Sequence, residues 1–268
     1  MSVSRYQEKL LTLGFSLVRQ SRVLETRAGS ALFQAAYFYY KRHLEDNLQD
    51  LVSFHPEVLG NAHVLDIGAN IGYTASVLAR AINGHRKVFA FEPEPFNFRL
   101  LERAAARPAV SGRIVPKQCA VGAEDGSVDL WLNPRHHADH RVITDQFRNE
   151  QPKASVKVPL ISIDRFLDGN TEVSFVKIDV QGYELPVCQG MVETIKKNPD
   201  MKVVLEYSPS SMRVLGYDPI TLICLLEEFK FHAYCIHPKG KLSAWSPLAG
   251  ETPSYDDLLF SRTPIEIV

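Results

Sequence analysis

Cysteine is scarce in this sequence, and its spacing carries no redox or metal signature. The four cysteines lie far apart, with neither a CxxC pair nor a CxxC-plus-His spacing among them. This absence argues against the common zinc modules and the thioredoxin-type motif. Because a free cysteine behaves as a small core residue, we expect the thiols to be reduced and mostly buried.

An excess of charge of one sign and long apolar runs are also missing. Lys and Arg number 30 against 31 Asp and Glu, a net charge of -1, which argues against a chain-wide basic field for nucleic acid or an anionic membrane. Near the N-terminus, Arg19, Arg22 and Glu25 interrupt the chain before it reaches the ~20 apolar residues of a membrane span. We therefore expect a cytoplasmic protein with no nucleic-acid partner and no membrane span.

No repeat, low-complexity tract or long linker divides the chain, so we predict one main domain with an N-terminal extension. Residues 1–55 are expected to form a helical appendage and residues 56–268 the main domain. Within the appendage, "YQEKLLTLGFSLVRQ" and "ALFQAAYFYYKRHLEDNLQDLV" are apolar at helical spacing. The aromatic stretch Tyr37 to Tyr40 is expected to cover part of a cleft or to form a homodimer contact, and simple packing on the main domain is the alternative.

From residue 63 on, short β-rich runs alternate with helical ones. Runs such as Val64-Leu65 and Val203-Val204-Leu205 are apolar on both faces, as in parallel strands covered by helices on each side. The pattern predicts a doubly wound, mostly parallel α/β sheet. The helices are expected near residues 71–82, 95–106, 184–197 and 218–229.

Two features depart from that alternation. The later runs "FHAYCI" and "YDDLLFSR" have only a short loop and no clear helix between them, which predicts an antiparallel hairpin at the sheet edge. Between residues 126 and 164, "SVDLWL" and "VKVPLISID" are predicted to be two extra strands that flank a polar loop.

The stretch "LDIGANIGY" at residues 65–73 places a carboxylate and two glycines between a predicted strand and a predicted helix. Such a turn needs glycine where φ is unusual or where a ligand approaches the backbone, and the helix offers free N–H groups. The dinucleotide fingerprint would need glycine at positions 68, 70 and 73, but the chain has Asn70 and Tyr73. A nicotinamide cofactor is therefore disfavoured, and another small polar ligand is expected.

Two acidic residues lie at the ends of consecutive predicted strands. Asp66, with Gly68 and Gly72, forms an acidic-x-Gly-x-x-x-Gly pattern that resembles the S-adenosylmethionine loop, where a carboxylate meets the ammonium directly or through water. Glu92 is placed to accept both ribose hydroxyls of an adenosine. Taken singly, Asp66 could instead cap the next helix and Glu92 could be a solvated strand end. Together they favour an adenosine cofactor.

Five stretches, in this order and spacing, resemble the FkbM-type S-adenosylmethionine-dependent methyltransferases: "LDIGANIGYTA", "VFAFEPEPFNFRLLE", "CAVGAEDGSVDLW", "VPLISIDRFL" and "VKIDVQGYE". The resemblance covers about residues 60–236 and implies the class I methyltransferase fold, a Rossmann-like sheet of seven mostly parallel strands. It also implies O-methylation of a small-molecule or glycan hydroxyl on a sugar or secondary metabolite. By position, the cofactor-binding residues are expected to be Asp66, Gly68, Ala69, Asn70, Gly72, Tyr73, Thr74, Glu92, Pro93, Cys119 and Ala120.

The segment "QCAVG" matches the one beside the adenine in this family. Many methyltransferases have an acid there that accepts the adenine amino group, whereas this chain has Gln118 and Cys119. We therefore expect adenine contact through the backbone or an amide. Alternatively, Cys119 and Ala120 only pack a strand.

The stretch "VKIDVQGYE" ends the fourth predicted strand, and open sheets bind ligands outside such ends. Methyl transfer from a sulfonium needs the acceptor oxygen held in line and its proton removed during attack. Asp179 is the expected base, with Lys177 beside it and Glu206 at the end of the next strand. These carboxylates could instead hold a divalent cation, as such acids can in related class I enzymes, or one could form a salt bridge with Lys177 or Arg213. We favour a site without metal.

The polar loop "RHHADHR" concentrates histidine and arginine side chains. His140 is the second candidate base, since imidazole takes up a proton near neutral pH. A solvated surface loop is the alternative. The HHxxH spacing lacks the helical HExxH context, so zinc is not expected.

The sequence thus predicts an S-adenosylmethionine-dependent O-methyltransferase. A non-catalytic, cofactor-binding scaffold of the same fold is one alternative, and a nicotinamide-dependent oxidoreductase is a less favoured one. The presence of Asp66, Gly68, Gly72 and Glu92 favours the enzyme.

Overall fold

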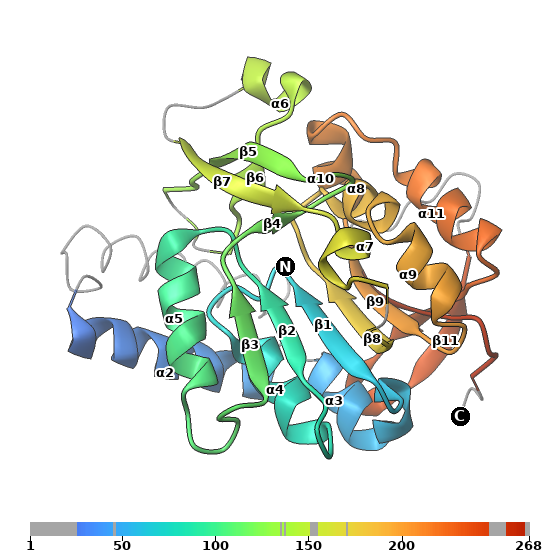
Figure 1. The fold of residues 1–268 in the computed structure, drawn as a ribbon, viewed down its shortest axis with the longest axis horizontal. Helices are drawn as coiled ribbons and strands as arrows, with labels where there is room; N and C mark the ends of the chain where they lie inside the picture. The colour runs from blue at the N-terminus through green and yellow to red at the C-terminus, as the bar shows by residue number, and fades with distance from the viewer. Residues whose placement is uncertain are drawn as a thin grey trace.

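The computed structural model describes residues 26–44, 47–134, 136, 138–150, 155–169, 171–246 and 256–265. Within them, one large sheet is covered by helices, and a smaller sheet lies beyond the carboxyl ends of β1, β2 and β3 (Figure 1). This is the α/β architecture that the sequence predicts. None of the described helices combines the length and the hydropathy that a bilayer crossing requires.

The large sheet has the order β11-β10-β12-β9-β8-β1-β2-β3, eight strands among the described residues. Its strands are β1 (His63–Ile67), β2 (Val88–Phe91), β3 (Ile114–Lys117), β8 (Val173–Ile178), β9 (Lys202–Tyr207), β10 (His232–Ile236), β11 (Leu242–Trp245) and β12 (Asp256–Ser261). From β3 to β9 the neighbours pair in parallel, and the last three strands are antiparallel. The predicted antiparallel pairing of β10 with β12 is confirmed. The sheet has one edge strand, β11, beyond the seven predicted. The sequence did not predict this strand, because its run is short and mixes polar with apolar residues.

The four predicted helices are present, with one division. They are α4 (Tyr73–Ala81), α5 (Pro95–Ala105), the pair α8 (Glu184–Gln189) and α9 (Val192–Lys197), and α11 (Pro219–Glu228). The chain turns at Gly190 and Met191, so the helix expected over 184–197 is two short helices. Shorter helical segments are η2 (Pro56–Leu59), α6 (Asp145–Glu150), α7 (Ile163–Phe166), α10 (Pro209–Val214) and η3 (Pro238–Gly240).

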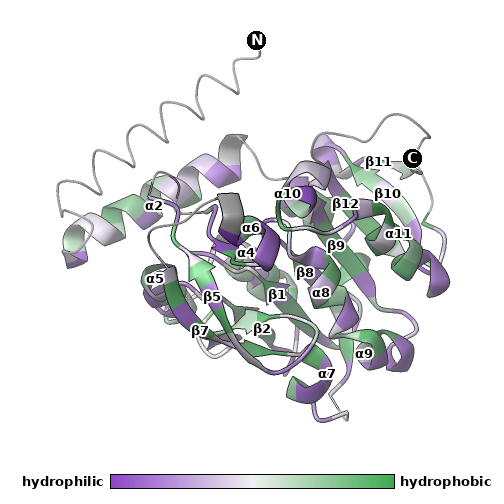
Figure 2. Ribbon diagram, turned by 90° about the horizontal axis from the view of Figure 1, so that it is seen from above, coloured by the Kyte–Doolittle hydropathy of each residue, from purple (hydrophilic) through white to green (hydrophobic). Residues whose placement is uncertain are grey.

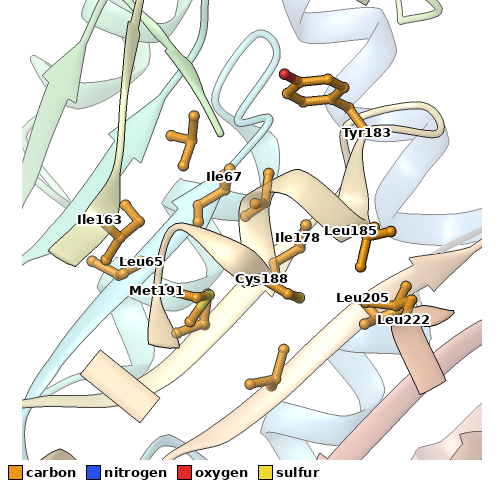
Figure 3. Packing of buried hydrophobic residues seen from close by; sticks show 14 of the residues in the cluster. Leu65, Ile67, Ile163, Ile178, Tyr183, Leu185, Cys188, Met191, Leu205 and Leu222 are labelled. Carbon is orange, nitrogen blue, oxygen red and sulfur yellow. The ribbon is translucent and has the colours of Figure 1, made fainter. Parts of the chain in front are cut away.

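The central strands send alternate residues into two apolar layers, as parallel strands covered on both faces do. Val64 lies in the core cluster to which α4 and α5 contribute. Leu65 and Ile67 lie in the other cluster, to which α8, α9 and α11 contribute (Figure 3). All six residues of β8 are buried. These rigid strands fix where the loops at their carboxyl ends begin.

The N-terminal segment contains α2 (Arg27–Leu44) and α3 (Asn47–Phe54), and the helix expected nearer the start lies outside the described residues. Seen from above, α2 runs along the side of the molecule that carries α4 (Figure 2). Leu48, Leu51 and Val52 of α3 are buried in the same cluster as Val64. The domain boundary at residue 55 stays a prediction, but the residues just before it contribute to the main core.

The small sheet has the order β4-β7-β5-β6 in the described part of the chain. Its strands are β4 (Ala120–Val121), β5 (Gly126–Trp131), β6 (Arg141–Val142) and β7 (Ser155–Ile161). The two extra strands predicted from the sequence are β5 and β7, and they pair antiparallel. The segment "QCAVG" directly follows β3 and contains β4, so the chain passes there from the large sheet to the small one. The small sheet therefore borders the edge where a ligand of such a fold binds.

Candidate active site

The loop after β1 is pressed against the loop after β8. The Asp179 N–H donates to the Ile67 carbonyl at 2.9 Å, and the Gly68 N–H donates to the Phe91 carbonyl at 3.0 Å. Gly68 has a φ of +84°, and a Cβ added there would lie 1.8 Å from the Asp179 carbonyl oxygen. The predicted need for an unusual φ is confirmed, and the close neighbour is the Asp179 backbone. Gly72 ends this loop directly before α4.

Other expected members of the cofactor loop lie around the start of α4. Ala69 is buried, and Thr74 is half-buried at the second position of the helix. The Tyr73 hydroxyl donates to Gln49 Oε1 at 3.0 Å, and its ring meets Phe38 edge-on with the centroids 5.3 Å apart. The side chain of Tyr73 thus joins the loop to α2 and α3.

Asp66 is completely buried in β1, and neither carboxylate oxygen has a hydrogen-bond partner among the described residues. Burial raises its pKa to about 6; Lys177 opposes this shift and Asp179 adds to it. The Ala75 N–H also lowers this pKa without completing a hydrogen bond. Asp66 does not cap α4, whose N-cap is Gly72. A buried carboxylate with unused lone pairs suits a cationic hydrogen-bond donor.

Glu92 follows β2 and is 5% exposed, so it is not a solvated strand end. Its Oε2 accepts from the Asn70 N–H and its Oε1 from the Glu94 N–H, both at 2.9 Å. Burial raises the pKa of Glu92 to about 8, against the lowering effect of the Glu94 N–H. Since a carboxylate oxygen can accept more than one hydrogen bond, both oxygens remain able to receive a hydroxyl. Pro93 is half-buried beside it.

The segment expected beside adenine crosses from the large sheet to the small one. Cys119 and Ala120 are each 6% exposed, whereas Gln118 is exposed. Burial raises the pKa of the Cys119 thiol to about 11, so it is a neutral, largely apolar group. Packing is what the structure shows for these two residues, and contact with adenine stays a prediction.

Four polar side chains meet at the ends of β8 and β9. Lys177 Nζ lies 2.7 Å from Asp179 Oδ2. Gln181 Nε2 donates to Asp179 Oδ1 at 2.9 Å and to Glu206 Oε2 at 2.8 Å. Lys177 and Glu206 are buried, whereas the Asp179 side chain is 30% exposed. We call these four residues the acid cluster, and Asp179 is its partly exposed carboxylate.

The charges in the acid cluster stabilise one another. Burial alone would raise the pKa of Asp179, but the Lys177 ammonium and the hydrogen bonds from Lys177 and Gln181 hold it below its ordinary value. Asp179 in turn raises the pKa of Lys177 despite burial. The salt bridge considered from the sequence is thus present with Lys177, whereas Arg213 is exposed on α10. Lys41 of α2 also lowers the pKa of Asp179, so this helix reaches the site electrostatically.

Glu184 is a further buried carboxylate near this edge. Its Oε1 accepts from the Gly182 N–H at 3.0 Å, and within the described chain its Oε2 has no hydrogen-bond partner. Burial raises its pKa to about 7, and the Gly182 N–H opposes that shift. Glu184 is the last residue of the stretch "VKIDVQGYE", for which the sequence predicts no individual role at this position.

Gln34 is a residue that the sequence analysis missed. It is 2% exposed on α2, and its Nε2 donates to the Ile71 carbonyl at 2.8 Å and to the Leu100 carbonyl at 2.7 Å. Ile71 lies inside the cofactor loop, so an N-terminal helix holds that loop from the side. The available signal was Ser30 and Gln34, two polar residues four apart within the apolar and aromatic part of α2.

His140 lies on the loop of the small sheet, where its Nδ1 accepts from the Asn133 N–H at 3.1 Å. Asp139 ties this loop together, since it accepts from Asn133 Nδ2 at 2.8 Å and pairs with Arg141 at 2.7 Å. Two neighbours named with it in the sequence, Arg135 and His137, lie outside the described residues. The loop is therefore internally bonded, and the role of His140 as a base stays a prediction.

Comparison with known proteins places this geometry in a family. The Methyltransferase FkbM domain matches residues 66–231. The hexuronic acid methyltransferase AglP of Haloferax volcanii is 28% identical over 187 residues, which cover 68% of this chain and 69% of that protein. The methyltransferase sdnD of Sordaria araneosa is 25% identical over 207 residues, which cover 66% of this chain and 77% of that protein.

Solved structures are similar over most of the chain. An O-methyltransferase from Bacillus cereus in complex with SAH has a TM-score of 0.48 at 13% identity, covering 86% of each chain. A fibrillarin from Aeropyrum pernix with natively bound S-adenosyl-L-methionine has a TM-score of 0.41 at 12% identity, covering 76% of this chain and 67% of that one. The family match spans more than half of the sequence, and it includes Asp66, Gly68 and Gly72 of the turn, Glu92, and all four residues of the acid cluster. This chain therefore belongs to the FkbM methyltransferase family and is an S-adenosylmethionine-dependent methyltransferase.

Proposed function

We propose that this enzyme methylates a hydroxyl oxygen on a sugar, a glycan or a hydroxylated secondary metabolite. One relative is named a hexuronic acid methyltransferase, which supports an acceptor of the sugar class. The observation that carries the proposal is the contact between the cofactor loop and the Asp179 backbone at Gly68. This contact supports a site in which the partly exposed Asp179 carboxylate lies next to the methyl donor.

The polar atoms of the turn suit S-adenosylmethionine. That cofactor donates hydrogen bonds from an ammonium and from two ribose hydroxyls, and when bound it supplies an activated methyl group. Asp66 offers two buried oxygens, and Asn70 Oδ1 is likewise buried with no partner in the described part of the chain. Glu92 is held by two backbone N–H groups with both oxygens still able to accept. We assign the ammonium to Asp66 and the ribose to Glu92.

Asp179 is proposed to hold the acceptor hydroxyl. Because its pKa is below the ordinary value, it is ionised at neutral pH and accepts the hydroxyl hydrogen bond. This orients an oxygen lone pair toward the methyl group, and the proton passes to Asp179 as the new bond forms. Lys177 donates to Oδ2 of Asp179 and so holds the carboxylate in place. Orientation of the acceptor hydroxyl is therefore the larger contribution that we propose for Asp179. His140 is the second candidate base. Glu206 accepts a hydrogen bond from Gln181 and is connected to Asp179 through it.

The test combines a cofactor assay with an acceptor screen. Mass spectrometry of the purified protein should detect a bound adenosyl ligand. Labelled S-adenosylmethionine should then transfer its methyl group to members of a panel of sugar acids, neutral sugars and hydroxylated polyketides. Methylation of an acceptor carboxyl or amine instead of a hydroxyl would contradict the proposal. Cofactor binding with no transfer to any acceptor would favour the scaffold alternative.

Three further expectations accompany the proposal and stay predictions: a cytoplasmic location, no nucleic-acid partner, and a homodimer in which α2 is the expected contact. Tyr39 and Leu32 are exposed on that helix, at 68% and 73%. Mass measurement in solution, with and without these side chains, tests the dimer.

A further inference from the structure

Gln181 occupies an unusual place between two carboxylates. A single atom, Nε2, donates to Asp179 at 2.9 Å and to Glu206 at 2.8 Å, and these residues lie at the ends of neighbouring strands. An amide nitrogen carries two hydrogens, so both are used in these contacts. The side chain therefore acts as a neutral clamp on two acids that would otherwise repel each other.

The backbone at Gln181 and Gly182 has an unusual conformation, which sets the direction of the Gln181 side chain. Gln181 has a φ of 55°, a left-handed conformation that is uncommon for a residue with a Cβ. A Cβ at the following Gly182 would lie 2.6 Å from the Ser211 carbonyl oxygen, and the Gly182 N–H is held by Glu184. Strained residues of this kind persist where the surrounding structure determines them, and they cluster at functional sites.

The amide nitrogen stands where a cation would otherwise balance the two acids. Calcium binds carboxylate oxygens at about 2.3–2.6 Å and magnesium at about 2.0–2.1 Å. The Nε2 position, at 2.8 and 2.9 Å from one oxygen of each carboxylate, lies slightly beyond the calcium range, so a small movement of the two carboxylates would admit that ion. Lys177 already contributes the positive charge, on Asp179 directly and on Glu206 at longer range.

We propose that Gln181 is a positioning residue that holds Asp179 and Glu206 together in place of a divalent cation. Residue 181 then decides whether this site binds a metal: an amide whose nitrogen donates to both carboxylates excludes the ion, and a carboxylate at the same place would complete an oxygen ligand set of three acids. The inference rests on the proposed role of Asp179 in orienting the acceptor. Its central test, however, measures ion binding and needs no methyl transfer.

The experiment titrates calcium chloride and magnesium chloride calorimetrically into the full chain and two variants, Gln181→Glu and Gln181→Met. Methionine has similar length but donates no hydrogen bond, so it is the matched control. We expect Gln181→Glu to bind one calcium ion at least ~10-fold more tightly than wild type or Gln181→Met, because only it supplies a third carboxylate. Adding Asp179→Asn to Gln181→Glu should abolish this gain.

Two results would overturn the inference. The first is a wild-type protein that binds one divalent ion and loses it on Asp179→Asn. The second is a Gln181→Glu variant that binds calcium no better than Gln181→Met. Binding of S-adenosylhomocysteine monitors folding in every variant. If methionine is not tolerated at this backbone conformation, Gln181→Gly replaces it, since glycine accepts a positive φ.

A kinetic measurement separates positioning from simple stability. With an acceptor found in the screen, Gln181→Met should lower kcat by ~10-fold or more while the Kd of S-adenosylhomocysteine stays unchanged, because the hydroxyl is held less well. An unchanged kcat would contradict the positioning role. Failure to find any acceptor would count against the proposed function, while the calcium titration would still decide the role of residue 181.

Discussion

Replacement of Glu92 by alanine is the sharpest test of the cofactor site. The side chain is buried, holds the Asn70 and Glu94 N–H groups, and is proposed to accept the ribose hydroxyls. Alanine removes these acceptors together. S-adenosylmethionine and S-adenosylhomocysteine should both bind wild type with 1:1 stoichiometry, and both should bind Glu92→Ala less tightly.

Above pH 8, where Glu92 is largely ionised, the magnitude follows from hydrogen bonds to a charged group, which contribute about 1.5–3 kcal/mol. A net loss of about 1.5–3 kcal/mol corresponds to an affinity lower by roughly 10- to 150-fold. Glu94→Gln is the matched control, because its amide oxygen can still accept from the Asn97 N–H at the start of α5. This control should leave cofactor affinity near the wild-type value.

The pH dependence provides an independent measurement. Burial raises the pKa of Glu92 to about 8, so the free site is largely protonated at neutral pH. Ribose hydroxyls favour the ionised form, so affinity should rise by up to about tenfold per pH unit as pH increases toward 8. For stability the sign is opposite. The folded state holds this proton more tightly than the unfolded state, so the Glu92 contribution falls as pH rises from 4.5 to about 8.

Isothermal titration calorimetry in buffers of different ionisation enthalpy measures both the affinity and the proton released on binding. Equal affinity of wild type and Glu92→Ala would remove Glu92 from the ribose site. Tighter binding of NAD than of the adenosyl cofactor would refute the whole cofactor assignment.

Three further predictions concern other parts of the molecule. Asp179→Asn should keep cofactor affinity and reduce turnover by ~100-fold or more, and full turnover on the true acceptor would end its proposed role. Gly68→Ala should lower the free energy of unfolding by about 2–4 kcal/mol in urea melts, since its Cβ would meet a carbonyl oxygen at 1.8 Å. Gly84→Ala, at a positive φ with open space around it, should lose only about 1 kcal/mol, and equal losses would contradict the steric argument. Deleting residues 1–50, or replacing Gln34 by alanine, should weaken S-adenosylhomocysteine binding, whereas unchanged binding and kinetics would show α2 to be dispensable.

Local pattern was enough to predict the parallel sheet and the acids at its edge. Val64 and Leu65 face different core layers, and a run that is apolar on both faces shows this in sequence. Asp66 and Glu92 could be placed because each follows or ends such a run. Positions whose place in the fold follows from the residues next to them in the sequence could therefore be predicted from the sequence alone.

What could not be predicted depends on contacts between distant segments. Gly68 is required by the Asp179 backbone, which lies more than a hundred residues later in the sequence. The contact from Gln34 to the cofactor loop crosses 37 residues. The edge strand β11 pairs through only four residues, too few for periodicity to identify. Sequence pattern shows that these residues are polar or small but not which partner they meet.

The contacts at Gly68 and Gly182 have a consequence for redesign of the enzyme. Each residue lies so close to a backbone carbonyl that the loop after β8 has little room to change its path. New acceptors would therefore be introduced more readily through side chains of α2 and of the segment between β5 and β7. Exchange of the segment between β5 and β7 with that of a relative should alter acceptor preference while leaving the cofactor half of the enzyme intact.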